Sequence, residues 1–411
     1  MRLAAIAFVL ACGLAGCAAP PRRPAPPTAI NDAVPPGFPA SVRLVTTDLA
    51  GFTRRAPLFF TGIRDAAVGG HVDILSLSGG GSEGAFGAGV LVGLTRAHAR
   101  PRFDLVTGVS AGALIAPFAF LGSRWDGALQ NAFTTDHSAL LGRSPLWRFL
   151  RRLVVPLGRE HDDPLFDMVN HYVTPELVAA VARASEKGRR LVIATTDLDS
   201  EETVLWDMGV IAEHGGEAAR ALFRDVLVAS ASVPGAFPPV MIRVQQGRRV
   251  YDEMHVDGSV TTSLFAFPLV AGLGRVDLPP LHGGELYLIV NSPLARLPKT
   301  TPVSTVAVLA RSFSAGMTYK TRESIIDTIN LTSRLGMGFR MTAIPADFPT
   351  TSVVDFSAGF MRSLFDYGER CAVGGRIWLK PDQTLRRGIG PDASRSALDT
   401  PCPGAPRIAA R

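Results

Sequence analysis

Cysteine and charge are both scarce in this sequence of 411 residues, which holds four cysteines and only 19% Asp, Glu, Lys and Arg. No group of cysteines and histidines has the spacing of a zinc site, so we expect no metal and no cofactor. The net charge of +6 is not gathered into a basic run, which argues against a nucleic-acid partner. No internal repeat is present, and beyond the N-terminus no apolar stretch is long enough to cross a bilayer.

The first sixteen residues have the pattern of a secretory signal peptide. Met1 and Arg2 precede an apolar run that is too short to span a bilayer as a helix. The run ends Leu-Ala-Gly-Cys at residues 14–17 and resembles the lipobox of bacterial lipoproteins, which implies cleavage before Cys17 and acylation of that residue. By the sorting rule of enterobacterial lipoproteins, Ala18 favours the outer membrane. We therefore predict a lipid-anchored envelope protein facing the periplasm, with a plain secretory signal as the alternative.

Residues 17–40 are predicted to be a spacer behind the lipidated Cys17. Eight prolines lie between residues 20 and 39, and this composition favours an extended chain over helix or interior strand. After processing, Cys371 and Cys402 are the two cysteines left as thiols. In an oxidising periplasm they could pair, although the sequence does not prove that they meet.

The body of the chain alternates between strand-like and helix-like segments, which predicts an α/β fold with a mainly parallel sheet between two helical layers. From residue 305 to about 342, and again near 356–370, the pattern is helical without strands. We therefore predict a catalytic domain over 41–300 and a helical cap or C-terminal extension over 301–411 that ends in an irregular tail. The predicted strands are 72–77, 103–107, 191–195 and 286–290, and the predicted helices are 84–96, 110–121, 175–187 and 217–227.

A glycine-rich loop follows the first of these strands. It runs from Ser78 to Gly87, and its consecutive backbone N–H groups are suited to holding an anion. The loop also satisfies the GxGxxG fingerprint of dinucleotide-binding sites, with Asp104 twenty residues further on, where a ribose-binding acid is expected. That fingerprint alone is a weak signal. The three glycines that satisfy it are Gly79, Gly81 and Gly84.

A nucleophile-elbow pattern, GxSxG, lies between the next strand and helix. Gly108 and Gly112 flank Ser110, and such small neighbours allow a serine to sit on a strained turn with its hydroxyl exposed at a helix N-terminus. The helix dipole and the N–H of Ala111 are suited to stabilising an oxyanion. Ser82 also fits GxSxG, but its long glycine run is better suited to supplying hydrogen-bond donors, so Ser110 is the preferred nucleophile.

An Asp-Gly pair, Asp257-Gly258, ends a short strand-like segment and offers a carboxylate that can act as base to a serine. Together the glycine loop, GxSxG and Asp-Gly, in this order, resemble the patatin-like phospholipase family. The stretch of small residues and prolines at 228–240 strengthens the likeness, which covers residues 73–290.

The resemblance implies an α/β/α sandwich and hydrolysis of lipid esters through an acyl-enzyme, with a Ser–Asp dyad and no histidine. It makes Ser110 the nucleophile and Asp257 the proton acceptor, and it implies that an oxyanion hole is formed by the loop glycines, Gly79, Gly80 and Gly81. The sequence departs from the family at two places. Ser78 stands where many members have Asp, and Ser259 stands where Gly or Ala is usual.

Other interpretations remain open at this stage. An α/β-hydrolase triad would need a histidine, for which His282 and His255 are the candidates. A lipid-binding envelope lipoprotein without catalysis is the competing class. The helical region 305–342 is apolar enough to be an acyl-chain lid, although core packing is the commoner role. The adjacent acids Asp252 and Glu253 could suggest a divalent-ion site, although such pairs are usually solvated.

Overall fold

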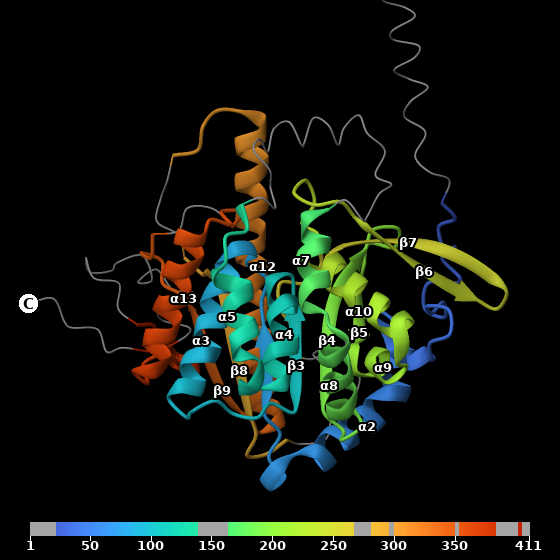
Figure 1. Cartoon of the computed structure of the whole chain (residues 1–411), viewed down its shortest axis with the longest axis horizontal. Helices are drawn as coiled ribbons and strands as arrows, with labels where there is room; N and C mark the ends of the chain where they lie inside the picture. The colour runs from blue at the N-terminus through green and yellow to red at the C-terminus, as the bar shows by residue number, and fades with distance from the viewer. Residues whose placement is uncertain are drawn as a thin grey trace, which may run out of the picture.

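The computed structural model describes residues 22–138, 163–266, 281–295, 300–349, 353–383 and 402–404 (Figure 1). The predicted signal peptide and the predicted lipidation site, Cys17, lie outside the described residues. Within the described ranges, no helix is both long enough and apolar enough to cross a membrane.

The described residues form a nine-stranded sheet whose centre is parallel. Its main order is β1-β5-β4-β3-β2-β8-β9, with the five strands from β4 to β9 parallel to one another. Strand β7 pairs antiparallel with β4, and β6 pairs antiparallel with β7. The strands are β1 (Arg43–Val45), β2 (Ile74–Leu77), β3 (Leu105–Val109), β4 (Arg190–Asp197), β5 (Glu202–Asp207), β6 (Val240–Gln246), β7 (Arg249–Asp257), β8 (Glu285–Pro293) and β9 (Gly338–Ile344).

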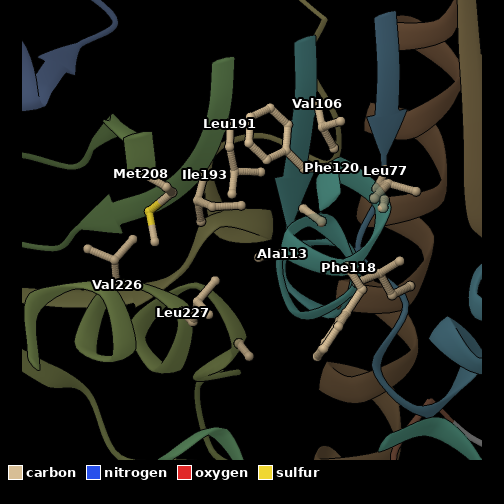
Figure 2. Packing of buried hydrophobic residues seen from close by; sticks show 14 of the residues in the cluster. Leu77, Val106, Ala113, Phe118, Phe120, Leu191, Ile193, Met208, Val226 and Leu227 are labelled. Carbon is tan, nitrogen blue, oxygen red and sulfur yellow. The ribbon is translucent and has the colours of Figure 1, made fainter. Parts of the chain in front are cut away.

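Helices cover both faces of this sheet, because successive strand residues point to opposite sides. In β2, Leu75 and Leu77 join one buried cluster and Ile74 joins the other. Figure 2 shows part of the first cluster, where Val106 and Ile193 of the sheet meet side chains from the helices. The second face is covered by α2 (Leu49–Ala66) and α12 (Thr305–Leu335). The first face is covered by α3 (Ala85–Arg96), α4 (Ala111–Leu121), α5 (Asp126–Thr134), α7 (Pro164–Tyr172), α8 (Pro175–Ser185), α9 (Met208–Glu213), α10 (Gly216–Ala231) and α13 (Ala358–Val373).

This architecture confirms the predicted three-layer α/β/α sandwich. The prediction of a strand-free helical region over 305–342 was wrong at its end, because Gly338–Ile344 forms β9 and pairs parallel with β8. Helix α13 packs against α3 at the same side of the sandwich (Figure 1). The sheet and its helical layers therefore continue beyond residue 300. Strand β9 and helix α13, which lie in the region predicted as a C-terminal extension, are thus part of the same sheet and helical layer as the residues before 300.

The N-terminal segment before β1 is also more than a spacer over its described part, residues 22–40. Ala29 and Ala33 are fully buried, and Val34 forms an antiparallel bridge with Gln245 of β6. Arg22 makes an ion pair with Asp199 at 2.6 Å. Proline excludes regular helix and interior strand, but it does not prevent an extended chain from packing on a hairpin, which is what this segment does.

Candidate active site

Ser110 occupies a strained turn between β3 and α4. Its φ of 54° and ψ of −124° lie where a residue with a side chain is rarely found, which is the geometry of a nucleophile elbow. The turn is possible because its neighbours are glycines. A Cβ added to Gly112 would lie 2.4 Å from the Leu77 carbonyl oxygen, and one added to Gly108 would lie 2.6 Å from the Gly112 oxygen.

Strand β4 brings Ser110 and Asp257 together. Strand β3 pairs with β4 as far as Val109, which lies opposite Ala194. The other edge of β4 pairs with β5. From Thr195 onwards, the edge that β3 has left therefore pairs with β7, and Asp257 lies opposite Thr195. The nucleophile and the carboxylate therefore meet where one strand ends and the other arrives.

The two side chains form a direct hydrogen bond. Ser110 Oγ donates to Asp257 Oδ2 at 2.6 Å, and both residues are buried. The second carboxylate oxygen, Oδ1, accepts the backbone N–H of Ser259 at 2.7 Å. Asp257 is thus held by two neutral donors, with one oxygen aimed at the serine hydroxyl.

Burial raises the pKa of Asp257 to about 6, against the opposing effect of the hydrogen bonds from Ser110 and Ser259. No ion pair with Asp257 is found in the described part of the chain. At neutral pH this carboxylate is ionised yet much more basic than an ordinary aspartate, which suits a group that must take a proton from a hydroxyl.

The glycine loop lies against the same two residues. A Cβ on Gly79 would lie 2.5 Å from Ser259 Oγ, and one on Gly80 would lie 2.0 Å from the Asn291 backbone oxygen, so neither position has room for a side chain. Gly81 has a φ of +57°, which also favours glycine.

Three backbone donors are available beside Ser110. Among the described residues, the N–H groups of Gly80, Gly81 and Ala111 donate to no protein acceptor. The N–H of Gly79 donates to the Ser263 carbonyl at 3.3 Å. The structure therefore does not favour the prediction that Gly79 supplies an oxyanion donor, since its N–H is already engaged within the loop.

Asn291 is a residue of this site that the sequence reasoning missed. It is fully buried near the end of β8, and its backbone N–H and side-chain amide donate to the hydroxyl and carbonyl of Ser78 at 2.8 and 2.9 Å. Its Oδ1 accepts the N–H of Gly87 at 3.1 Å. Asn291 thus holds both ends of the glycine loop. A polar residue directly after the strand-like run 286–290 was the available signal, because parallel strands place such residues at the site edge of the sheet.

Ser230 is a second missed residue. Its hydroxyl accepts the backbone N–H of Ser110 at 3.0 Å and donates to the Ala194 carbonyl at 2.7 Å. It lies in the small-residue stretch 228–240, whose small side chains allow α10 to approach the elbow. Ser230 therefore fixes the backbone of the nucleophile and occupies its N–H group.

A cavity of about 1150 Å³ opens onto the dyad. Ser110, Asp257 and the three loop glycines Gly79, Gly80 and Gly81 lie in its wall. The rest of the wall on the side of the first helical layer is mostly apolar, apart from His137 and Tyr172, which suits a hydrocarbon chain. This apolar part includes Leu114, Pro117, Phe118, Phe133, Leu165, Met168, Val169, Val173, Leu177, Leu227 and Phe237.

The alternative nucleophile and histidines do not share this arrangement. Ser82 is fully buried and is not part of the cavity wall among the described residues. His282 is exposed in the loop before β8. His255 is buried against Thr195, with its Nδ1 3.0 Å from Thr195 Oγ1, and does not contact Ser110. A histidine triad built on either residue is therefore not supported.

The remaining polar candidates have structural partners. Asp104 accepts hydrogen bonds from Arg102 at 2.9 Å and from the Asp73 backbone at 3.1 Å, so it joins segments of the sheet and is not a free ribose ligand. Asp252 and Glu253 point to opposite sides of β7. The expectation that both are solvated was wrong for Glu253, which is buried against Arg43.

Cys371 and Cys402, whose pairing the sequence left open, are joined by a disulfide. Cys371 lies in α13, so the bond ties the described residues 402–404 to the helix that packs on α3. The bond lies away from the dyad and belongs to the scaffold of the sandwich.

Comparisons with known proteins give one family match and several similar solved structures. Residues 75–270, which include Ser110 and Asp257, match the family model described as patatin-like phospholipase. No curated protein matches this chain. Among solved structures, the chain is similar to VipD from Legionella pneumophila, with 13% identity, a TM-score of 0.32, and 78% of this chain and 70% of that chain covered.

Two further solved structures are similar at the same level. Human GIVD cytosolic phospholipase A2 has 9% identity and a TM-score of 0.37, with 79% of this chain and 62% of that chain covered. The type III effector protein ExoU of Pseudomonas aeruginosa has 14% identity and a TM-score of 0.31, with 74% and 52% covered. The chain thus spans only part of the length of these two proteins.

Proposed function

We propose that this chain, whose residues 75–270 match the patatin-like phospholipase family model, hydrolyses lipid acyl esters through an acyl-enzyme on Ser110, with Asp257 as the base. The observation that carries this proposal is the 2.6 Å hydrogen bond from the elbow hydroxyl to a buried carboxylate whose pKa is raised to about 6. A structural serine needs neither the strained turn nor a basic partner.

In the first half of the reaction Ser110 Oγ attacks the ester carbonyl carbon, and its proton passes to Asp257 Oδ2. The carbonyl oxygen becomes an oxyanion that accepts hydrogen bonds from the N–H groups of Gly80, Gly81 and Ala111 in this proposal, which is supported by their lack of another acceptor among the described residues. Collapse of the tetrahedral species breaks the bond to the alcohol, which leaves with the proton from Asp257. The acyl group stays on Ser110.

In the second half a water molecule attacks the acyl-enzyme while Asp257 accepts one of its protons. The second tetrahedral species releases the fatty acid, and the proton returns to Ser110 Oγ. The apolar wall of the cavity supports this assignment, because it gives the acyl chain a place to lie next to Ser110 during both halves.

The test is to substitute Ser110→Ala and Asp257→Asn and to measure ester hydrolysis and labelling by a fluorophosphonate probe. We expect Ser110→Ala to take no label on the 103–121 peptide, and Asp257→Asn to lose hydrolysis by about a hundredfold to ten-thousandfold. Both variants should keep the wild-type circular dichroism spectrum. Wild-type turnover in either folded variant contradicts the proposal, and a label on Ser82 means that the wrong serine was chosen.

We also propose that the chain is a lipoprotein anchored through Cys17 to the outer membrane on its periplasmic side. The lipobox-like residues 14–17 support this proposal. Four residues lie between Cys17 and Arg22, where the packed segment begins, so the five Cα-to-Cα steps allow at most about 18 Å between anchor and body. Mass spectrometry of the mature N-terminus and membrane fractionation of Cys17→Ser test it. An unacylated wild-type N-terminus contradicts it.

A further inference from the structure

The wall of the cavity changes character from one side to the other. The helices of the first layer contribute mostly hydrocarbon, whereas the side formed by α12 and the residues before it combines apolar side chains, among them Leu309, Phe313 and Met317, with hydroxyl groups and one cation. Arg311 is the only lysine or arginine among the described residues of the wall. The hydroxyl groups on its side of the cavity belong to Thr300, Thr301, Ser314, Thr318 and Thr321.

Arg311 differs from the other basic residues on the inward side of its helix. Lys320 donates to the Val260 carbonyl at 2.7 Å, and Arg322 donates to the Leu294 carbonyl at 2.7 Å. Arg311 is partly buried, and within the described ranges it has no ion pair or hydrogen bond with another residue. A partly desolvated guanidinium without an acceptor is unfavourable, because it has given up water and gained no partner.

The position of Arg311 along α12 separates it from the reacting atoms. The nine residues from Arg311 to Lys320 correspond to roughly 13 Å of helix. Lys320 reaches the turn just after Asp257, through the Val260 carbonyl. This spacing along α12 suits a contact between Arg311 and the part of an ester beyond the scissile bond better than a contact with the oxyanion.

We propose that Arg311 binds the phosphodiester of a lipid head group, so that the cavity prefers phosphate-bearing acyl esters over neutral ones. This assignment rests on the proposed acyl hydrolase function, since it places an ester carbonyl at Ser110. The guanidinium fork matches two oxygens of a phosphate, and nearby hydroxyls can donate to the same group. The apolar wall takes the acyl chain at the other side of the dyad.

The experiment compares two esters that carry the same decanoyl chain, lysophosphatidylglycerol and 1-monoacylglycerol, each below its micelle concentration. In Arg311→Gln we expect kcat/KM for the phosphate-bearing ester to fall about tenfold to hundredfold, mainly through KM, while the neutral ester is unchanged. Arg311→Lys should keep part of the preference. The matched control is Arg334→Gln, which removes an exposed arginine near the far end of the same helix and outside the cavity wall.

An unchanged ratio between the two esters in Arg311→Gln overturns the proposal. Inorganic phosphate separates a lipid head group from a free anion. If millimolar phosphate inhibits monoacylglycerol hydrolysis through Arg311 while the wild type shows no preference between the lipids, the site serves a free anion and the head-group assignment is wrong.

Binding to Ser110→Ala protein, measured by calorimetry with the same two lipids, tests Arg311 without turnover. Lysophosphatidylglycerol should bind more weakly when Arg311→Gln is added, and monoacylglycerol should not. A wild-type protein that hydrolyses no ester and takes no fluorophosphonate refutes the hydrolase proposal, and this binding difference then still decides the role of Arg311.

Discussion

Strand β7 carries two buried carboxylates four residues apart, and their surroundings are opposite. In the middle of the strand, burial acts to raise the pKa of Glu253, but the hydrogen bond with His255 and the charge of Arg43 outweigh it and lower that pKa to about 2. At the end of the strand, Asp257 has only neutral donors, and burial raises its pKa to about 6.

Under the proposed function, this difference lets one strand serve both structure and chemistry. Glu253 joins β7 to Arg43 of β1, with Arg43 Nη2 donating to its Oε1 at 3.0 Å, and a permanently charged partner is suitable there. A cation at that distance from Asp257 would keep the carboxylate ionised but take away its basicity. The middle of the strand therefore holds the sheet to the N-terminal segment, and the end is left able to accept a proton.

The largest expected effect comes from breaking the ion pair of Glu253 in the middle of the strand. Arg43→Met leaves the Glu253 carboxylate buried without its cation, so we expect a loss of about 3 to 5 kcal/mol in the free energy of unfolding. The turnover of the remaining folded protein should change little. Urea unfolding and active-site titration measure the two quantities.

Two further variants control this prediction. Adding Glu253→Gln should restore most of the stability, because the uncompensated charge is removed. Arg243→Met removes the exposed pair of Arg243 with Asp252 on the same hairpin, which should cost about 0 to 1 kcal/mol. If Arg43→Met is as stable as the wild type, Glu253 is not the structural carboxylate that the comparison requires.

The next effect is a pH dependence of opposite sign for the two acids. The raised pKa of Asp257 contributes stability that is present below about pH 4 and is lost as the pH rises through about 6. The lowered pKa of Glu253 contributes stability that is present above about pH 4.5 and is lost as the pH falls towards 2. Relative to wild type, Asp257→Asn should therefore gain about 2 kcal/mol in unfolding free energy between pH 4 and pH 7.

Hydrolysis by the wild type should rise with pH through about 6, because only ionised Asp257 can accept the serine proton. Denaturation of wild type and Asp257→Asn at several pH values, together with a pH–rate profile, measures both effects. A stability difference that does not change between pH 4 and 7 contradicts the raised pKa.

The smallest expected effect concerns the position of the glycine loop beside Ser110, near the end of β7. Asn291→Asp replaces the amide donor to the Ser78 carbonyl by a carboxylate oxygen, so the glycine loop should shift away from its position beside Ser110. We expect kcat and the fluorophosphonate labelling rate to fall about tenfold with KM little changed, as for a misplaced oxyanion donor. Asn330→Asp, the same change at an exposed position of α12, is the control. Equal labelling rates in the two variants exclude this positioning role.

Some predictions from the sequence failed for identifiable reasons. The strand β9 was read as helix because it follows a long helical pattern, although Phe339, Met341 and Ala343 alternate with more polar residues as a strand does. Residues 22–40 were read as a spacer because proline excludes regular structure, but proline does not exclude burial of the intervening alanines.

The sequence by itself determined the local chemistry of the site. A serine between glycines at 108–112, a glycine run at 79–81 and an Asp-Gly pair are short patterns whose sterics depend on adjacent residues, so Ser110 and Asp257 could be chosen before any fold was known. Only the tertiary structure decided which donors of the loop are available and why Asp257 is basic while Glu253 is not. Those properties depend on burial, on the register of β4 with two other strands, and on partners such as Arg43 and Asn291 that lie about 200 residues away from the groups they hold.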